Sequence, residues 1–119
     1  MINTKEIGSY GENIALEYLL NRGYKLISKN FKSHFGEIDI IVKDKDLICF
    51  VEVKTRYNNN FGLPSQSIDK NKQKRIKKAS LLFVNKEKLF NFNLRYDVVE
   101  IFLNYKDDSY TINHLENAF

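Results

Sequence analysis

The chain has 119 residues, 43% of them hydrophobic and 29% charged, which suits one packed domain (residues 1–119) and leaves no room for two cores. The single cysteine excludes an internal disulfide, and the lack of a membrane-length apolar stretch favours a cytoplasmic protein with no membrane contact. The formal net charge of +4 favours a polyanionic partner without identifying one.

The first half of the chain predicts one helix and three strands. Apolar residues at three- and four-residue spacing over residues 4–22 predict an amphipathic helix, and Gly23 is placed to end it in a left-handed conformation. Three short runs rich in β-branched and apolar residues then predict strands, at residues 24–31, 37–43 and 47–54. The last two are close enough to pair as an antiparallel hairpin.

The second half predicts a loop, a helix and one or two further strands. Residues 55–66 contain three asparagines, a glycine and the only proline, which is typical of a loop. A second helix is predicted to start near Ser67 or Asp69 and to end near residue 86, followed by strands at residues 94–103 and 110–115. This order predicts an α/β or α+β domain in which helices pack on one mixed sheet.

Ionisable residues inside two of the predicted strands are the most informative feature. Asp39, Glu52 and Lys54 lie in apolar surroundings, where a charge is costly unless it is paired or bound to a metal. Side chains alternate along a strand, so Glu52 and Lys54 point to one face, and the hairpin brings Asp39 opposite the end of the second strand. Such carboxylates can hold Mg²⁺ or Mn²⁺ for phosphodiester hydrolysis, with the lysine assisting. A structural cluster of ion pairs is the alternative.

Other residues can face the same region. Glu12 lies beside the apolar stripe of the first helix and can reach the sheet, although a solvated glutamate is the alternative. Lys72 and Arg75 flank the apolar stripe of the second helix and can point into a groove, where they would contact phosphates. In the predicted loop, Tyr57 and Phe61 can either stack on bases or anchor the loop.

Two further polar residues have structural interpretations. Cys49 lies in an apolar run and is interpreted as a small buried hydrophobe, not as a nucleophile. Asp97 follows Arg95 closely, and it can pair either with that residue or with Lys54.

Short motifs are spread over nearly the whole chain: Gly11-Glu12-x-x-Ala15, Gly36-Glu37-Ile38-Asp39, Phe50-Val51-Glu52-Val53-Lys54-x-Arg56, Lys72-x-x-Arg75-Ile76, Arg95-Tyr96-Asp97 and His114-Leu115-x-Asn117-Ala118-Phe119. In this order they resemble the YraN-like family of small bacterial proteins, which itself resembles Holliday-junction resolvases and other PD-(D/E)XK nucleases. The resemblance implies an α/β, restriction-endonuclease-like core with a central mixed β-sheet flanked by α-helices. The strict nuclease motif has proline before its aspartate, whereas this chain has Ile38, and the proline does no chemistry.

The resemblance also implies a metal-dependent endonuclease acting on DNA, with branched or damaged DNA as candidate substrates. It assigns Mg²⁺ or Mn²⁺ to Asp39, Glu52 and the carbonyl of Val53. It places Lys54 at the attacking water or the transition state, and Glu12 at a second metal or a bound water. Phosphate contacts fall to Arg56, Lys72 and Arg75. A resolvase acting on a symmetric four-way junction would be a homodimer. A non-catalytic module that binds nucleic acid or another partner on the same fold is the alternative.

Overall fold

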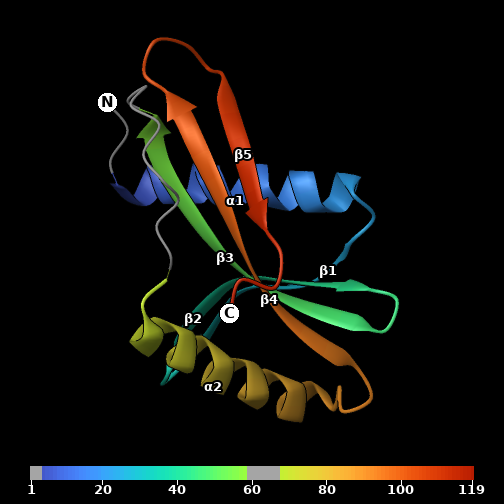
Figure 1. Ribbon diagram of the computed structural model, residues 1–119. Coiled ribbons are helices and arrows are strands. Elements are labelled where there is room, and N and C mark those ends of the chain that lie inside the picture. Colours follow the sequence, from blue (N-terminus) through green and yellow to red (C-terminus); the bar gives the residue numbers. More distant parts are fainter. Residues whose placement is uncertain (1–3, 59–67) are drawn as a thin grey trace.

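The computed structural model describes residues 4–58 and 68–119 and contains two helices and five strands (Figure 1). The helices are α1 (Thr4–Asn21) and α2 (Lys70–Glu87). The strands are β1 (Lys25–Ser33), β2 (Gly36–Asp44), β3 (Leu47–Asn58), β4 (Asn93–Asn104) and β5 (Tyr110–Leu115). Each predicted element is present. Within the described ranges, no helix combines the length and the apolar character needed to cross a membrane.

The strands form one sheet in the order β1-β2-β3-β4-β5. Strands β3 and β4 are parallel, while the other neighbouring pairs are antiparallel. Parallel neighbours need a long crossover connection, and here α2 lies within it. The predicted fold class, an α/β domain whose central mixed sheet is flanked by helices, is confirmed, and the arrangement is compatible with a restriction-endonuclease-like core.

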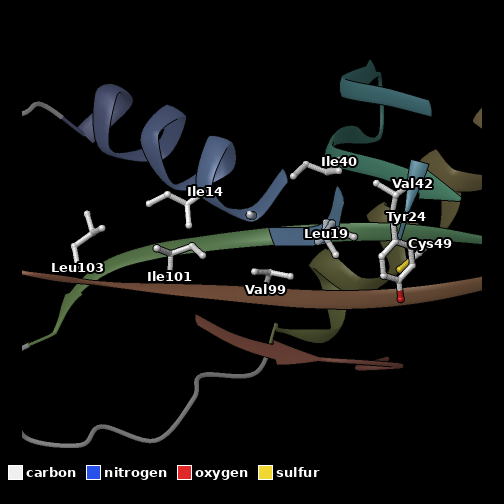
Figure 2. Packing of buried hydrophobic residues seen from close by; sticks show 11 residues of the cluster. Ile14, Leu19, Tyr24, Ile40, Val42, Cys49, Val99, Ile101 and Leu103 are labelled. Carbon is white, nitrogen blue, oxygen red and sulfur yellow. The ribbon is translucent and has the colours of Figure 1, made fainter. Parts of the chain in front are cut away.

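The sheet buries a hydrophobic core on each face, one under α1 and one under α2. The core under α1, shown in Figure 2, includes Ile14, Leu19, Ile40, Val51 and Val99. The core under α2 includes Ile38, Ile41, Phe50, Ile76 and Phe83. Because β3 side chains alternate, the neighbours Phe50 and Val51 enter opposite cores. Cys49 is fully buried in the core under α1, which confirms its interpretation as a small buried hydrophobe.

The helix ends follow the sequence signals. Gly23 has φ +96° and closes α1, with its backbone N–H donating to the carbonyl of Leu20. Asp69 is the N-cap of α2 because its carboxylate accepts the backbone N–H of Lys72 at 2.8 Å. The alternative start at Ser67 lies outside the described residues.

The predicted end of the third strand was wrong. Strand β3 continues to Asn58 because its last residues pair in parallel with β4, from Thr55 opposite Ile101 onward. Tyr57 packs against the core under α1 and stacks on Tyr105, with ring centroids 4.6 Å apart, so it anchors this end of the sheet. Phe61 and the remainder of the predicted loop lie outside the described residues.

Helix α1 approaches β3 most closely at Gly11. A Cβ atom added at this glycine would overlap the hydroxyl oxygen of Thr55, so only glycine lets the helix lie so near the strand. The close approach brings the next residue, Glu12, to the edge of the sheet near Asp39.

Candidate functional site

Strand β2 separates from β3 at Asp39. The residue pairing between the two strands ends at Ile40 and Val51. Beyond that point the side chain of Asp39 continues the bonding, because its Oδ2 accepts the backbone N–H of Val53 at 2.8 Å. The carboxylate is thereby held against β3, next to the segment that carries Glu52.

The alternation of β2 also changes at this place. Ile38 and Ile40 would share a face in a regular strand, yet Ile38 enters the core under α2 and Ile40 the core under α1. On the neighbouring strand β1, Asn30 adopts a left-handed conformation with φ 54°. Asparagine tolerates this conformation better than most residues. This irregularity in β1 and β2 leaves Asp39 outside both hydrophobic cores.

The electrostatic environment of Asp39 is strongly unfavourable to a negative charge. Burial is the largest cause, and the carboxylates of Glu52 and then Glu12 add to it, raising the pKa of Asp39 to about 7. The Val53 N–H and the Lys72 ammonium act in the opposite direction but do not restore the usual value. A cation bound next to Asp39 would relieve this repulsion.

Glu52 is paired with a lysine from the crossover helix. It is buried, with 8% of its side chain exposed, and its Oε1 lies 2.9 Å from Nζ of Lys72. The lysine side chain is itself 41% exposed. The ammonium of Lys72 therefore neutralises the more buried carboxylate of the site from its solvent side.

These residues line a pocket of about 550 Å³ between the β1–β2 turn and α2. The sheet contributes Asp39 and Glu52, and the helix contributes Lys72, Arg75 and Ile76. The turn contributes Ser33, His34, Phe35, Gly36 and Glu37. The pocket thus combines three carboxylates, two from the middle of the sheet and one from the β1–β2 hairpin, with two basic side chains of α2.

Glu12 reaches the sheet but does not line this pocket. Its Oε1 accepts a hydrogen bond from Nδ2 of Asn30 at 2.9 Å, and the same Nδ2 donates to Glu37 at 2.9 Å. Asn30 therefore holds two carboxylates near Asp39, one of which belongs to the pocket wall. Neither Asn30 nor Glu37 was among the predicted site residues.

Lys54, Arg56 and Val53 stand outside the pocket lining. Lys54 follows Glu52 by two residues and so projects from the same face of β3. Within residues 4–58 and 68–119, no hydrogen bond or ion pair engages the side chain of Lys54 or of Arg56. The structure thus brings together Asp39, Glu52, Lys72 and Arg75, with Glu12 nearby, and leaves the two remaining basic residues further along β3.

The acidic residues of the pocket suit a divalent cation without forming a complete protein-only site. In the described part of the chain, no three histidine, cysteine, aspartate or glutamate side chains are grouped closely enough to form a complete metal site. Asp39 and Glu52 nevertheless fit Mg²⁺ or Mn²⁺, which prefer oxygen ligands, and Mg²⁺ usually keeps several waters and binds only one or two carboxylates. Lys72 already places a positive charge on Glu52, where a cation would lie.

The aromatic residues of the β1–β2 turn, His34 and Phe35, were also not among the site residues predicted from the sequence. The rings of His34 and Phe35 are tilted by 38° with centroids 4.1 Å apart, and Nζ of Lys78 lies 5.5 Å from the Phe35 centroid. Two aromatic rings thus contribute to the lining of the pocket that also contains Arg75. Two adjacent aromatic residues before Gly36 were the available signal, but nothing in the sequence indicates that this turn faces α2.

A second charged cluster surrounds Asp97 and is separate from the pocket. Both oxygens of this fully buried carboxylate bond Arg95 at 2.8 Å, and one also contacts Nε2 of His114 at 2.7 Å. The backbone N–H of Asn117 donates to the other oxygen at 3.0 Å. Burial raises the pKa of Asp97, but these bonds outweigh it and hold the pKa well below its usual range. Asp97 therefore pairs with Arg95 and not with Lys54.

Comparison with known proteins identifies relatives of the whole chain. The model of "Uncharacterised protein family UPF0102" matches residues 11–101. A UPF0102 protein of Clostridium botulinum (strain Alaska E43 / Type E3) is 47% identical over 115 residues, covering 97% of this chain and 94% of that protein. UPF0102 proteins of Clostridium beijerinckii and Clostridium acetobutylicum are 45% and 42% identical over 115 residues, with the same two coverages. The chain therefore belongs to the UPF0102 family, the YraN-like family of small bacterial proteins that its motifs resemble.

Proposed function

We propose that this protein is a metal-dependent endonuclease that hydrolyses phosphodiester bonds in DNA, with branched or damaged DNA as the substrate class. One observation carries the proposal: Asp39 and Glu52 share an open pocket with Lys72 and Arg75. The carboxylates suit a divalent cation, and the basic side chains suit the phosphates of a nucleic acid. The net charge of +4 adds a general attraction for a polyanion.

In this proposal the carboxylates of the pocket bind the metal, and the basic side chains bind the phosphates. Mg²⁺ or Mn²⁺ held by Asp39 and Glu52 would polarise the scissile phosphate and acidify a bound water. Arg75 binds a phosphate from the helix wall, and Lys72 does so once it leaves Glu52. Lys54 approaches from the same face of β3 and stabilises the charge that develops in the transition state.

Three more residues support this arrangement. The backbone of Val53 fixes Asp39 through its N–H, and its carbonyl is proposed as a further oxygen ligand of the cation. Glu12, oriented by Asn30, acts through a second metal or a bound water. Arg56 holds a phosphate further along β3. We propose a homodimer only if the substrate is a four-way junction. Such a junction is symmetric, and cutting two of its strands requires two equivalent sites.

A non-catalytic nucleic-acid-binding module on the same fold is the second candidate. It is favoured by one observation, the ion pair between Lys72 and Glu52, which neutralises the pocket without a metal. The two functions differ in outcome, because a binding module retains DNA without producing any metal-dependent product.

The function is tested with linear, flapped, forked and four-way DNA in the presence of Mn²⁺. We expect the wild-type protein to nick or cut at least one of these substrates, and Lys54→Ala to abolish the product. The variant should remain folded, since Lys54 is only partly buried and belongs to neither hydrophobic core, and circular dichroism checks this. Lys25→Ala, which changes an exposed lysine of β1, is the matched control and should cut like wild type.

Two results contradict the proposal. One is the absence of any metal-dependent product from the wild-type protein on the whole substrate panel. The other is full activity of the Lys54→Ala variant, which points to a contaminating nuclease. DNA binding without cleavage supports the binding module instead.

The ion pair at Glu52 predicts competition between Lys72 and the metal. Lys72→Met should bind Mn²⁺ about 10-fold more tightly in the absence of DNA, because the cation no longer displaces an ammonium at 2.9 Å. The same variant should bind DNA several-fold more weakly, with the slope of log affinity against log salt reduced by about 1. Calorimetric titration measures the first effect and fluorescence anisotropy the second.

Lys74→Met is the control for this substitution, since Lys74 is an exposed lysine of the same helix that does not line the pocket. It should leave the Mn²⁺ affinity unchanged. If Lys72→Met leaves the metal affinity unchanged or lowers it, the cation does not compete with the lysine for Glu52.

A further inference from the structure

One side-chain oxygen of Glu100 on β4 has no hydrogen-bond partner among the described residues. The residue is fully buried, and its Oε1 accepts a hydrogen bond from Nδ2 of Asn113 on β5 at 2.9 Å. Across residues 4–58 and 68–119, its Oε2 is the one buried side-chain nitrogen or oxygen without a hydrogen-bond partner. A buried carboxylate with an unmet oxygen is destabilising, so a positive or hydrogen-bonding partner is expected to reach it in the working protein.

The register of the sheet places Lys54 beside Glu100. The two residues are direct Cα partners in the parallel pair of β3 and β4. Paired residues of neighbouring strands project from the same face about 4.8 Å apart at the backbone. That face also carries Glu52, so the order across it runs from the carboxylate of the pocket to Lys54 and on to Glu100.

Lys54 has the complementary property. It is partly buried, and no ion pair or hydrogen bond holds its ammonium anywhere in the described ranges. A long, unrestrained side chain loses rotamer freedom when it is fixed for catalysis. The carboxylate of Glu100, directly opposite on the neighbouring strand, can bind the ammonium after only a small movement of the lysine side chain.

We propose that Glu100 is a positioning residue for Lys54. Its Oε2 accepts a hydrogen bond from the ammonium of Lys54 and so holds the lysine in one orientation beside the pocket. The catalytic consequence rests on the proposed endonuclease function, whereas the pairing of the two side chains does not. Glu100 itself touches neither the substrate nor the metal. It acts by holding the amine in one orientation and by keeping it close to the scissile phosphate.

Arg56 is the competing cation for the same oxygen. It projects from the same face of β3 two residues beyond Lys54, and its own Cα partner on β4 is Phe102. A contact with Glu100 would therefore have to run diagonally across the strands, over a longer distance. This geometry favours Lys54, and a test must separate the two.

The pairing is tested without any activity assay by thermal unfolding of the full chain. Glu100→Gln keeps the shape and the bond from Asn113 but removes the charge. We expect its effect on Tm in the wild-type background to differ by about 3 °C or more from its effect in the Lys54→Met background. In an Arg56→Met background, the effect should equal that in wild type. Where Glu100→Gln does not fold, Glu100→Asp replaces it in the same cycle, because the shortened carboxylate also breaks the contact.

The catalytic role is tested by kinetics on the substrate that the protein cuts. Glu100→Gln should lower kcat about 10- to 100-fold with little change in KM for DNA, as expected when a catalytic group is misplaced. Mn²⁺ affinity, measured by calorimetry, should stay at the wild-type value. Glu87→Gln, an exposed glutamate at the end of α2, should change none of these quantities.

Each outcome decides a different question. Equal Tm effects of Glu100→Gln in all backgrounds, or coupling to Arg56 alone, overturn the pairing with Lys54. A raised KM with unchanged kcat overturns the positioning role, since Glu100 would then act on DNA binding. Coupling to Lys54 in a protein that cuts no DNA sustains the pairing and rejects the endonuclease function.

Discussion

An Asp39→Asn variant is expected to lose metal-dependent DNA cleavage by about three orders of magnitude or more, while gaining thermal stability at neutral pH. The loss follows from the proposed function, because a neutral amide is a poor ligand for a divalent cation. The gain follows from the structure alone. The amide oxygen can still accept the Val53 N–H, and the substitution removes a charge next to Glu52 and Glu12.

The sign of the pH dependence follows from the raised pKa. Asp39 has a pKa of about 7 in the folded protein, against an ordinary value of 3.8. Below about pH 4 the group is protonated in both the folded and the unfolded chain, so aspartate and asparagine should be similar. As pH rises toward 7 and beyond, the unfolded chain ionises first and the folded state loses relative stability. The stability gain of Asp39→Asn should therefore be largest above pH 7.

Differential scanning fluorimetry between pH 4 and pH 8 measures this effect. We expect Tm of Asp39→Asn to exceed that of wild type by about 5 °C or more at pH 8 and by little at pH 4. Added Mn²⁺ should raise Tm of the wild-type protein and not of the variant. Asp44→Asn, an exposed aspartate of the same strand, is the control and should show neither effect. A variant less stable than wild type at pH 8 contradicts the electrostatic account.

Much of the fold was predictable because local patterns and long-range packing agree. The apolar stripe of α1 and the Ile- and Val-rich strands β2 and β3 match the layers that the structure buries. The exception is the end of β3, where polar residues predicted a loop. Parallel pairing with β4 satisfies the backbone there, and a pairing between segments so distant in sequence has no local signal.

The candidate site was predictable only where one hairpin determines it. Asp39 and Glu52 lie on adjacent antiparallel strands, so their approach follows from the turn between those strands. The contact between Lys72 and Glu52 depends instead on how α2 crosses the sheet, which no local pattern specifies. Glu100 lies among the apolar residues of β4, and no local pattern marks it as a site residue. Only the register with β3 shows that it faces Lys54.

Replacing Asp97 with asparagine is expected to lower the free energy of unfolding by about 3–5 kcal/mol, because it breaks a buried ion pair. Both oxygens of Asp97 accept an N–H of Arg95, so either orientation of the amide turns an NH₂ group toward an Arg95 donor. Among the described residues, the substitution also removes the one buried carboxylate that forms an ion pair with this guanidinium. Urea unfolding followed by circular dichroism measures the loss.

Glu116→Gln is the matched control, because Glu116 is the second carboxylate near Arg95 but lies 3.8 Å away with half of its side chain exposed. Its removal should cost less than about 1 kcal/mol. The pKa of Asp97 is lowered in the folded state, so its stabilising contribution is complete above about pH 4 and declines as the pH falls further. The difference between wild type and Asp97→Asn should therefore be smaller at pH 3 than at pH 7. Equal effects of the two substitutions at pH 7 would show that burial of Asp97 adds nothing to its ion pair.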